Sequence, residues 1–367
     1  MMNQENKNIQ TTPSSDAPVS VEFRNIIKAY GDVHAVDDVS FKIHKGELVT
    51  VLGPSGCGKT TTLRMIAGLE LPTSGSIHIG GDDVTRLTAT HRDVSMVFQS
   101  YALFPHMNVI QNVSYGLVVS GMKKADAAVK AEVALKTVGL EGFGQRLPSE
   151  LSGGQQQRVA VARALVLEPE VLLFDEPLSN LDAKLRRHMR EEIRALQQNL
   201  NLTAVYVTHD QEEAMAVSDR IIVMKNAVIA QEGTPRDLYE RPKNKFVASF
   251  IGEANLVETK AEKVEGNLYK VTLDNVVKFI EQDNLVENKT TWAVLRPEGI
   301  KLHAEQGENR LKVSTKLATY LGSHYEYEFE SSLGILFTTS ADFGFTPKEG
   351  DDVHIEFSDT GFYLVQE

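Results

Sequence analysis

The sequence predicts an α/β domain followed by a mostly β domain. Up to about residue 246, short apolar, β-branched runs alternate with longer stretches of helical periodicity, which is the pattern of strand–helix–strand units. Beyond residue 245, strand-like runs recur at intervals of roughly ten residues, separated by Gly, Asn and Asp, as in small barrels or sandwiches. We therefore expect a disordered tail (1–19), an α/β domain (20–243) and a C-terminal β domain (244–367).

Composition and charge exclude several classes of protein. The 367 residues are 42% apolar and 24% charged, as in ordinary globular proteins, and no apolar run exceeds four residues, so no segment could span a bilayer. The N-terminus has neither a basic start nor an apolar stretch, which argues against a signal peptide. The single cysteine, Cys57, cannot form an internal disulfide, which fits a reducing compartment. A net charge of −12 disfavours nucleic acid as a partner.

The clearest secondary structure lies in the second half of the α/β domain. Residues 171–174 and 204–207 have the composition of strands buried in a parallel sheet. Between them, residues 183–200 carry apolar side chains at spacings of three and four, which predicts an amphipathic helix. Residues 123–138 predict another helix, which Gly139 ends. In the β domain we expect strands at 268–273, 292–295, 314–320, 325–330 and 354–357.

A phosphate-binding loop is predicted between an expected strand (49–52) and an expected helix (61–67). The loop reads Gly53-Pro54-Ser55-Gly56-Cys57-Gly58-Lys59-Thr60, the pattern G-x-x-x-x-G-K-T. Its glycines let backbone amides surround a β-phosphate, and the helix N-terminus adds partial positive charge. Lys59 would contact the β and γ oxygens, Thr60 would ligate Mg²⁺, and Thr61 would bind a phosphate oxygen. The alternative is an ordinary glycine turn with a surface lysine, which the flanking strand and helix disfavour.

Polar residues that follow two predicted strands extend this site. Asp175 and Glu176 come directly after the strand 171–174, where Asp175 can hold Mg²⁺ and Glu176 can polarise an attacking water. His209 follows the strand 204–207 and can sense or stabilise a γ-phosphate. Because ligand sites lie at the carboxyl ends of parallel strands, Glu176 and His209 should face one crevice. A solvated acidic strand end and an unremarkable surface histidine are the alternatives. The residues indicate an ATPase or a GTPase, and the absence of an N-K-x-D motif favours ATP.

The segment Leu151-Ser152-Gly153-Gly154-Gln155 carries a family resemblance. The sequence resembles the ATP-binding subunits of ABC transporters, whose signature is that pentapeptide, and the resemblance covers nearly the whole chain. By this resemblance Tyr30 matches the aromatic residue that stacks on adenine, Gln99 the Q-loop glutamine and His209 the switch histidine. Residues 179–182 resemble the D-loop, which contains Asp182. The family usually has Ala where this chain has Asn180, and this departure leaves Asp182 unaffected.

The motifs and the resemblance together define the expected site residues. The resemblance implies catalytic roles for Lys59, Gln99, Glu176 and His209, and Mg²⁺ ligation by Thr60, Gln99 and Asp175. It implies contacts with ATP by Tyr30, Gly53, Pro54, Ser55, Gly56, Cys57, Gly58, Lys59, Thr60, Thr61, Ser152, Gly153, Gly154, Gln155 and Asp182.

The resemblance also implies a fold and an assembly. The fold is a P-loop ATPase of the ABC nucleotide-binding type with a helical subdomain. Ser152 and the amides of Gly153 and Gly154 would form a second phosphate-binding nest at the start of a helix over 155–167. In the family, the phosphate loop and the signature that bind one ATP come from opposite subunits, which implies a homodimer with twofold symmetry. Residues 99–105 resemble the surface that grips the permease, so dimer closure would become a movement of the membrane domain.

The C-terminal domain resembles the TOBE-type, OB-like β-barrel of importer ATPases for polyamines, ferric iron, maltose and sulfate. The segments 250–255 and 295–300 carry this weaker resemblance. A spacer for dimerisation and a regulatory ligand-binding domain are both open readings of it. Within the stretch 320–327, we expect His324, Tyr325 and Tyr327 to pack or turn in the barrel rather than to ligate metal.

The resemblance implies the ATPase of an importer, with ferric iron as the expected cargo. The resemblance of the junction 250–255 and of the stretch 320–327 favours ferric iron. A polyamine such as spermidine or putrescine is the alternative, and thiamine, phosphonate and sugar importers stay open. Implied partners are permease subunits and a periplasmic or extracellular substrate-binding protein, with the chain peripheral on the cytoplasmic face of the inner membrane. A soluble ABC-type ATPase acting on DNA or ribosomes is less favoured, since the chain has neither paired cassettes nor long coiled coils. A nutrient sensor with a degenerate ATPase conflicts with intact Lys59, Asp175, Glu176 and His209.

Overall fold

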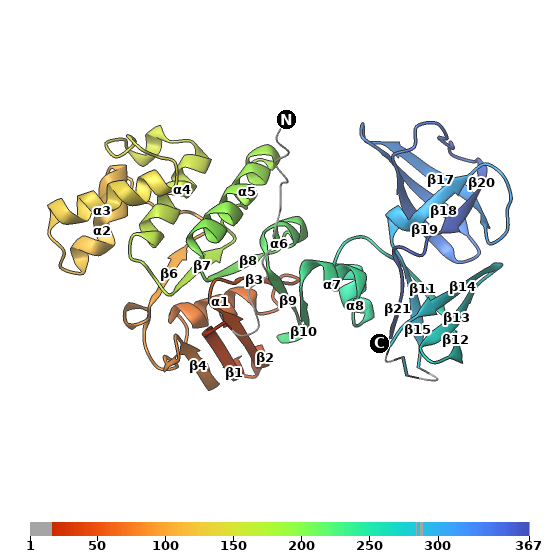
Figure 1. Cartoon of the computed structure of the whole chain (residues 1–367), viewed down its shortest axis with the longest axis horizontal. Coiled ribbons are helices and arrows are strands. Elements are labelled where there is room, and N and C mark those ends of the chain that lie inside the picture. The colour runs from red at the N-terminus through yellow and green to blue at the C-terminus, as the bar shows by residue number, and fades with distance from the viewer. Residues whose placement is uncertain (1–16, 284, 287–288, 367) are drawn as a thin grey trace, which may run out of the picture. The chain divides into compact units, whose positions relative to one another are not determined.

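The computed structural model describes residues 17–283, 285–286 and 289–366 and divides the chain into two compact units, 1–235 and 236–367 (Figure 1). Most of the expected tail lies outside the described residues. At its end, Val19 already begins strand β1 (Val19–Tyr30). The division between the units falls at Pro235, earlier in the chain than the boundary at 243 expected from the sequence.

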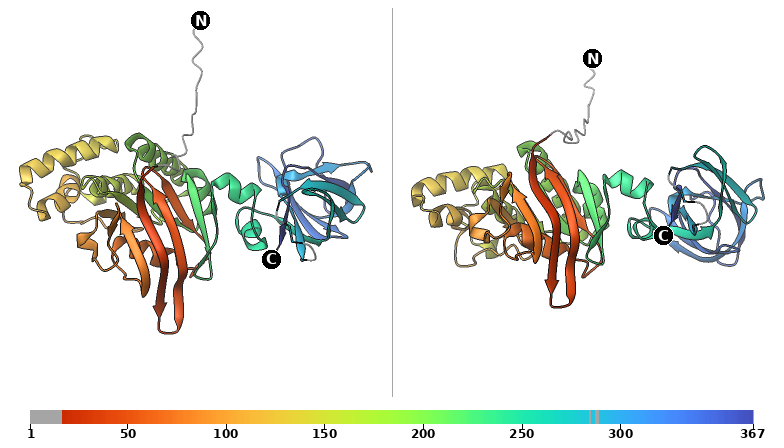
Figure 2. Two further views of the ribbon diagram at one scale, coloured as in Figure 1. Left: turned by 60° about the horizontal axis from the view of Figure 1, so that its bottom comes forward. Right: turned by 90° about the horizontal axis from the view of Figure 1, so that it is seen from below.

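The first unit contains two sheets. One is antiparallel, in the order β2-β1-β4-β5, and Figure 2 shows its long hairpin of β1 and β2 in red. The other has the order β10-β9-β3-β8-β7-β6 and is parallel except for β10. The further strands are β2 (Val33–His44), β3 (Leu48–Leu52), β4 (Ser74–Ile79), β5 (Asp82–Asp83), β6 (Val94–Val97), β7 (Val171–Asp175), β8 (Ala204–Thr208), β9 (Arg220–Lys225) and β10 (Val228–Gly233).

The central parallel sheet is buried on both faces, which explains the uninterrupted apolar runs of its strands. On β7, Val171 and Leu173 join a core with helix α1 (Lys59–Ala67) and the antiparallel sheet. The alternate residues Leu172 and Phe174 join a second core with helices α4 (Gly153–Leu165) and α5 (Ala183–Leu200). The result is three layers with the parallel sheet in the middle.

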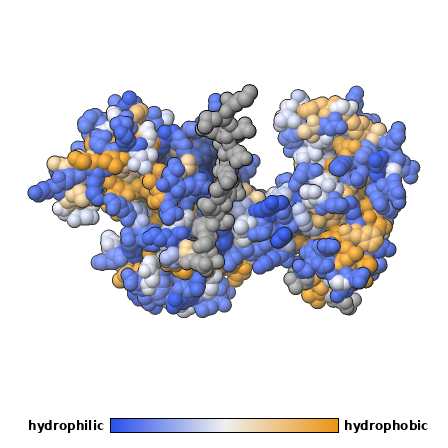
Figure 3. Space-filling view, in the orientation of Figure 1, coloured by the Kyte–Doolittle hydropathy of each residue, from blue (hydrophilic) through white to orange (hydrophobic). Residues whose placement is uncertain are grey.

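A helical part extends the first unit. Helices α2 (Val109–Val119) and α3 (Lys124–Thr137) pack with α4 around a shared apolar cluster. Exposed valines, among them Val119, Val129 and Val133, leave apolar surface on this part (Figure 3). Two short 3-10 turns, 89–91 and 148–150, and helix α6 (Gln211–Val217) complete the unit. The expected α/β fold with a helical subdomain is confirmed, and α5 spans the residues predicted for its helix.

The second unit is mostly β, as predicted. Its three sheets have the orders β11-β15-β21, β12-β13-β14 and β16-β20-β17-β18-β19, and all three contribute to one apolar core. The strands are β11 (Asn255–Thr259), β12 (Ala261–Glu265), β13 (Leu268–Leu273), β14 (Val276–Glu281), β15 (Thr291–Leu295), β16 (Ile300–His303), β17 (Leu311–Tyr320), β18 (Tyr325–Ser331), β19 (Gly334–Ser340), β20 (Asp352–Phe357) and β21 (Phe362–Gln366). A 3-10 turn, η3 (Pro297–Gly299), follows β15. In β18, Tyr327 is fully buried and stacks on Phe329, which agrees with the packing role expected for it.

One buried arginine explains why the boundary precedes the expected position. Arg296 is fully buried and donates hydrogen bonds to backbone carbonyls in and around the short helices α7 (Pro235–Glu240) and α8 (Lys245–Phe250). These carbonyls belong to Tyr239, Ala248 and Ile251. The helices are thereby tied to the β unit. Among the described residues, no helix is long and apolar enough to cross a membrane.

Candidate functional site

Four neighbouring parallel strands end at one edge of the central sheet and carry the predicted site. In the order β3, β8, β7 and β6, they lead into the phosphate loop, His209, Glu176 and Gln99 (Figure 1). Parallel pairing places these carboxyl ends side by side. The Nδ1 atom of His209 lies 3.1 Å from Oε2 of Glu176, so the predicted proximity of these two side chains is confirmed.

The phosphate loop is closed around its own lysine. Lys59 is buried, and its Nζ donates hydrogen bonds to the carbonyls of Gly53 at 2.8 Å and Pro54 at 2.9 Å. Gly58 has a φ of +106°, and a Cβ there would lie only 2.4 Å from the carbonyl oxygen of Ala35. Only glycine fits this position. The close approach also places strand β2 directly beside the loop.

Cys57 differs from its neighbours in the loop because its side chain is buried. Its Sγ lies 4.0 Å from Nζ of Lys59. Burial raises the pKa of the Cys57 thiol, although the charge of Lys59 opposes this shift. By contrast, Pro54, Ser55 and Gly56 are exposed. The backbone of the loop, rather than the thiol, is therefore accessible to a ligand.

The two carboxylates after β7 have different environments. Asp175 is partly buried, and loss of hydration raises the pKa of its carboxyl, while the charge of Arg64 lowers it and that of Glu176 raises it further. Glu176 has a φ of +45°, a left-handed conformation that costs a non-glycine residue about 1 kcal/mol or more. Its N–H donates to the carbonyl of Val207 at 2.9 Å, and its own carbonyl accepts a hydrogen bond from Ser179 Oγ at 3.0 Å. These bonds hold the strained residue in place.

Asn180, the residue that departs from the family pattern, connects the turn that contains Gln99 to the segment that contains Asp182. Gln99 is exposed in the turn after β6, and its carbonyl accepts a hydrogen bond from the side-chain amide of Asn180 at 2.9 Å. Asp182 caps α5, since its carboxylate accepts the N–H of Leu185 at 2.9 Å. Asn180 therefore connects the segment 179–182 to the start of the Gln99 turn.

The signature residues begin a different helix from the phosphate loop. Ser152 and Gln155 form a reciprocal capping box at the start of α4, in which Ser152 N–H donates to Oε1 of Gln155 at 2.9 Å. Gly153 and Gly154 are the first two residues of this helix. Helix α4 packs on α2 and α3, whereas α1, which follows the phosphate loop, packs against β2, β6, β7 and β8.

Tyr30 lies at the end of β1 with half of its surface exposed. Its hydroxyl donates to Oε1 of Glu70 at 2.8 Å, and Nζ of Lys28 lies 4.7 Å from the ring centroid. Burial is the main cause that raises the pKa of Tyr30, and the hydrogen bond to Glu70 raises it further. The ring is thus fixed at its polar end, and part of it is free to stack on a planar ligand.

The donor set fits Mg²⁺ bound together with phosphates. Helix α1, which carries Thr60, packs against β7, which ends in Asp175. Burial raises the pKa of the Asp175 carboxyl, and a cation beside it would favour the charged form. Hydroxyl and carboxylate oxygens are the ligands Mg²⁺ prefers, and it usually takes only one or two from protein. Accordingly, the described residues contain no group of three His, Cys, Asp or Glu side chains placed to hold a metal by themselves.

Sequence reasoning missed Arg163, which holds the turn after Gln99. Its guanidinium donates to the carbonyls of Tyr101 at 2.8 Å and Ala102 at 2.7 Å. No local signal indicated this contact, because an arginine on a helix usually lies at the surface and neither Tyr nor Ala marks a left-handed turn.

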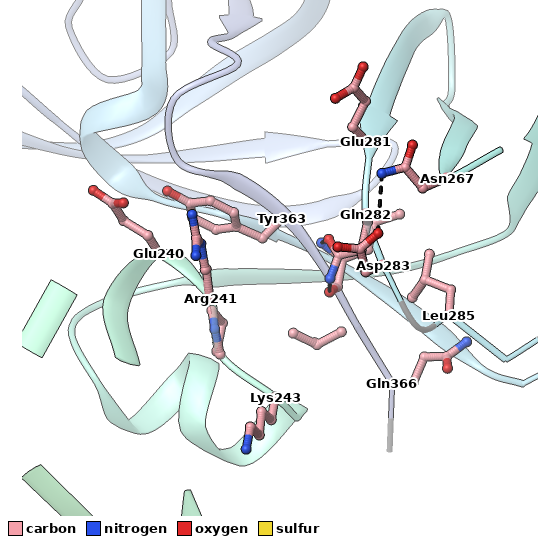
Figure 4. Close-up of a pocket in the computed structure, with 13 residues that line it drawn as sticks. Glu240, Arg241, Lys243, Asn267, Glu281, Gln282, Asp283, Leu285, Tyr363 and Gln366 are labelled. Carbon is pink, nitrogen blue, oxygen red and sulfur yellow. Dashed lines mark hydrogen bonds between the residues drawn. The ribbon is translucent and has the colours of Figure 1, made fainter. Parts of the chain in front are cut away.

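The second unit has a cavity of its own, with a volume of about 740 Å³ (Figure 4). Arg241 and Lys243 line one side, and Glu281 and Asp283 line the other, where Asp283 accepts a hydrogen bond from Asn267. The cavity combines opposite charges and contains none of the predicted site residues.

Known families and proteins match both units. The ABC transporter family matches residues 36–179, and the TOBE domain matches residues 293–364. The chain is 55% identical to the Fe(3+) ions import ATP-binding protein FbpC of Agrobacterium fabrum, over 95% of this chain and 98% of that protein. It is 47% identical to the protein of the same name from Vibrio cholerae, over 94% of this chain and 97% of that one.

Two solved structures resemble the first unit. A dimeric ATP-binding cassette in a post-hydrolysis state with ADP and Pi is 33% identical, with a TM-score of 0.52, and the match covers 59% of this chain and 99% of that one. The cbiO1 protein of Clostridium perfringens, part of the ABC transporter complex cbiONQ, is 28% identical with a TM-score of 0.57, over 61% of this chain and 91% of that one. The chain therefore belongs to the ABC transporter family, as one of its ATP-binding proteins.

Proposed function

We propose that this chain, an ABC-type ATPase, uses ATP hydrolysis to drive the import of ferric iron through a partner permease. The observation that carries the proposal is the identity of 47% to 56% with Fe(3+) ions import ATP-binding proteins along nearly the whole chain. The site at the sheet edge supports the ATPase part, because phosphate loop, carboxylates and histidine all leave adjacent strand ends.

Lys59 binds the β- and γ-phosphates of ATP in this proposal. Its ammonium now satisfies two carbonyls of its own loop, those of Gly53 and Pro54. Phosphate oxygens are stronger acceptors than neutral carbonyls, so ATP would draw the ammonium towards them. The backbone N–H groups of Ser55 and Gly56, both exposed residues, and the N-terminus of α1 would bind the remaining charge.

Glu176 acts as the base that takes a proton from the water attacking the γ-phosphorus. The bond between the γ-phosphorus and the bridging oxygen breaks, and the products are ADP and phosphate. The contact with His209 orients the Glu176 carboxylate, and His209, which is largely exposed, can also donate a hydrogen bond to the γ-phosphate. The strained backbone of Glu176 fixes where the carboxylate begins.

Thr60, Asp175 and Gln99 would hold Mg²⁺. The ion neutralises charge on the β- and γ-phosphates when it is bound. Asp175 would contribute the charged oxygen. Burial raises the pKa of its carboxyl, and a bound cation would favour the charged form. Gln99 would contribute from the exposed turn after β6.

Two copies of the chain would bind two ATP molecules between them. In each copy the phosphate loop starts α1 and the signature starts α4, which packs in the helical part. The first N–H groups of each helix have no acceptor within the helix, so the signature of one copy can bind the γ-phosphate held by the other. Asp182 would lie at the same interface. The dimeric form of the similar cassette with ADP and Pi supports this arrangement.

The remaining partners follow from the importer role. The segment 99–105 would bind the permease. Within this segment, the ring of Phe104 contacts that of Tyr115 on α2. Binding to the permease would hold the chain on the cytoplasmic face of the inner membrane as a peripheral protein. A substrate-binding protein on the other side of the membrane would deliver the cargo. No nucleic acid is required at any step.

Uptake measurements test the cargo. Cells that lack this chain are complemented with wild type or with Glu176→Gln, and uptake of labelled ferric iron and labelled spermidine is measured in parallel. Ferric iron uptake that returns only with wild type supports the proposal. Restoration of spermidine uptake alone would assign the chain to polyamine import. If neither uptake depends on the chain, while the purified protein hydrolyses ATP, a soluble ATPase role gains support.

A further inference from the structure

The turn that follows Gln99 has a disfavoured backbone conformation. Tyr101 and Ala102 have φ angles of +59° and +49°, so two successive non-glycine residues are left-handed. In this conformation Cβ crowds the neighbouring carbonyl oxygen, and such residues persist only when their surroundings hold them. The side chain of Tyr101 is buried. That of Ala102 is exposed, so its packing does not fix the conformation of its backbone.

Arg163 supplies two of the hydrogen bonds that hold this turn. It lies near the end of α4, and its Nη1 and Nη2 donate hydrogen bonds to the carbonyls of Ala102 at 2.7 Å and Tyr101 at 2.8 Å. The two carbonyls are those of the two left-handed residues. A planar guanidinium can bind both at once, which a single ammonium cannot do with the same geometry. Burial lowers the pKa of Arg163, because it removes water from the charged guanidinium.

The turn at Tyr101 and Ala102 lies between Gln99, which is bound by the segment 179–182, and Phe104. At its beginning, the Gln99 carbonyl is bound by Asn180 of the segment 179–182. Just after its end comes Phe104, whose ring centroid lies 5.8 Å from the Arg163 guanidinium. Arg163 therefore contacts the turn in its middle, between the site glutamine and the aromatic side chain that follows.

We propose that Arg163 is a positioning residue that maintains the strained turn at Tyr101 and Ala102 and thereby keeps Gln99 directed at the nucleotide site. Because Arg163 belongs to α4, the helix that Ser152 caps, a displacement of α4 would move the turn as well. The inference rests on the role proposed for Gln99 in the ATPase site. In this proposal Arg163 does not contact ATP.

The first test uses glycine to remove the strain. Arg163→Gln in the purified full-length chain should lower kcat for ATP hydrolysis by about tenfold or more, with the KM for ATP changed less than about threefold. The kcat of Ala102→Gly alone is measured as the reference for the double variant. Added to Arg163→Gln, Ala102→Gly should restore kcat at least about threefold, since glycine adopts the left-handed conformation without support. A role of Arg163 in packing α4 alone would give no such rescue.

The second test asks whether Arg163 acts through Gln99. Gln99→Ala should lower kcat, and adding Arg163→Gln to it should lower kcat by less than about twofold more. Arg158→Gln is the matched control, because Arg158 lies on the same helix and pairs with Glu192 at 2.6 Å, away from the turn. Its kcat should stay within about twofold of wild type.

The outcomes separate the inference from the proposed function. If Arg163→Gln has wild-type kcat, if glycine gives no rescue, or if the effects of Arg163→Gln and Gln99→Ala multiply, the inference is overturned while the ATPase role stands. A wild-type chain that hydrolyses no ATP, alone or with its permease, overturns both. Should Arg163→Gln fail to fold by circular dichroism, Arg163→Lys replaces it, with a smaller loss of kcat and the same rescue by Ala102→Gly expected.

Discussion

Replacing Arg296 with methionine is expected to destabilise the second unit strongly. Arg296 is fully buried, and its guanidinium lies within hydrogen-bond distance of four backbone carbonyls, those of Tyr239 at 2.9 Å, Ala248 at 3.1 Å, Ile251 at 2.8 Å and Glu253 at 3.0 Å. The last three share the two N–H groups of Nη1. Methionine has an unbranched apolar side chain that can follow the path of the arginine stem but ends before the guanidinium. It would therefore fill much of the space and leave all four carbonyls without their donor.

The magnitude follows from these four bonds. A buried acceptor that loses its partner costs about 1–3 kcal/mol, although carbonyls can regain part of this through water. Removal of the buried charge returns some free energy, since burial lowers the pKa of Arg296 and thus opposes its charged form. The net loss of unfolding free energy for Arg296→Met should be about 3–5 kcal/mol, because the cost of several unpaired carbonyls exceeds what removal of the charge returns.

Urea denaturation followed by tryptophan fluorescence measures this loss. The sequence has one tryptophan, Trp292, which lies in β15 of the second unit, 3.2 Å from Nζ of Lys245 to the ring centroid. Its fluorescence therefore reports the unfolding of that unit. With a slope of about 1–3 kcal/mol per molar urea, the midpoint should fall by roughly 2 M. ATP binding by the first unit should be unchanged.

The matched control is Arg310→Met. Arg310 is partly exposed and donates to the carbonyl of Glu305 at 3.1 Å, so its loss should cost less than about 1 kcal/mol. Arg296→Lys should fall between wild type and Arg296→Met, because one ammonium cannot reach all four carbonyls. A loss below about 1 kcal/mol for Arg296→Met would refute the argument that these bonds hold α7 and α8 on the β unit.

Four further outcomes are expected. Glu176→Gln should slow ATP hydrolysis at least about 100-fold while ATP still induces dimers in size-exclusion chromatography, and turnover within tenfold of wild type would contradict the base role. Cys57 should react with iodoacetamide at pH 8 at least about tenfold more slowly in the folded than in the urea-unfolded chain, and faster as pH rises, because its raised pKa leaves little thiolate; equal rates by mass spectrometry would show an accessible thiol. Tyr30→Ala should weaken binding of a fluorescent ATP analogue about tenfold through lost stacking, with kcat nearly unchanged; a loss in kcat instead would argue against base stacking. Asn180→Ala should lower kcat about fivefold, the equivalent of one hydrogen bond of about 1 kcal/mol to Gln99, and an unchanged kcat would show that this bond does not serve the site.

Much of the candidate site could be predicted because its motifs are local. The glycines, Lys59 and Thr60 are contiguous, and the strand before them and the helix after them follow from residue type and periodicity. The proximity of Glu176 and His209 was also predictable, since both follow apolar strands whose carboxyl ends meet at one edge of a parallel sheet. The helix Ala183–Leu200 agrees with its predicted bounds because its apolar spacing is regular along its whole length.

The sequence by itself determined the family, the phosphate loop and the carboxylates at the strand end. Each of these depends on neighbouring residues, whose types restrict the backbone directly. Only the tertiary structure decided which distant groups hold that site and where the units divide. Arg163 meets Ala102 across 61 positions, and Arg296 meets Tyr239 across 57. Contacts over such separations depend on how helices and strands pack against one another. The residue types at these positions therefore do not predict the left-handed turn or the buried guanidinium.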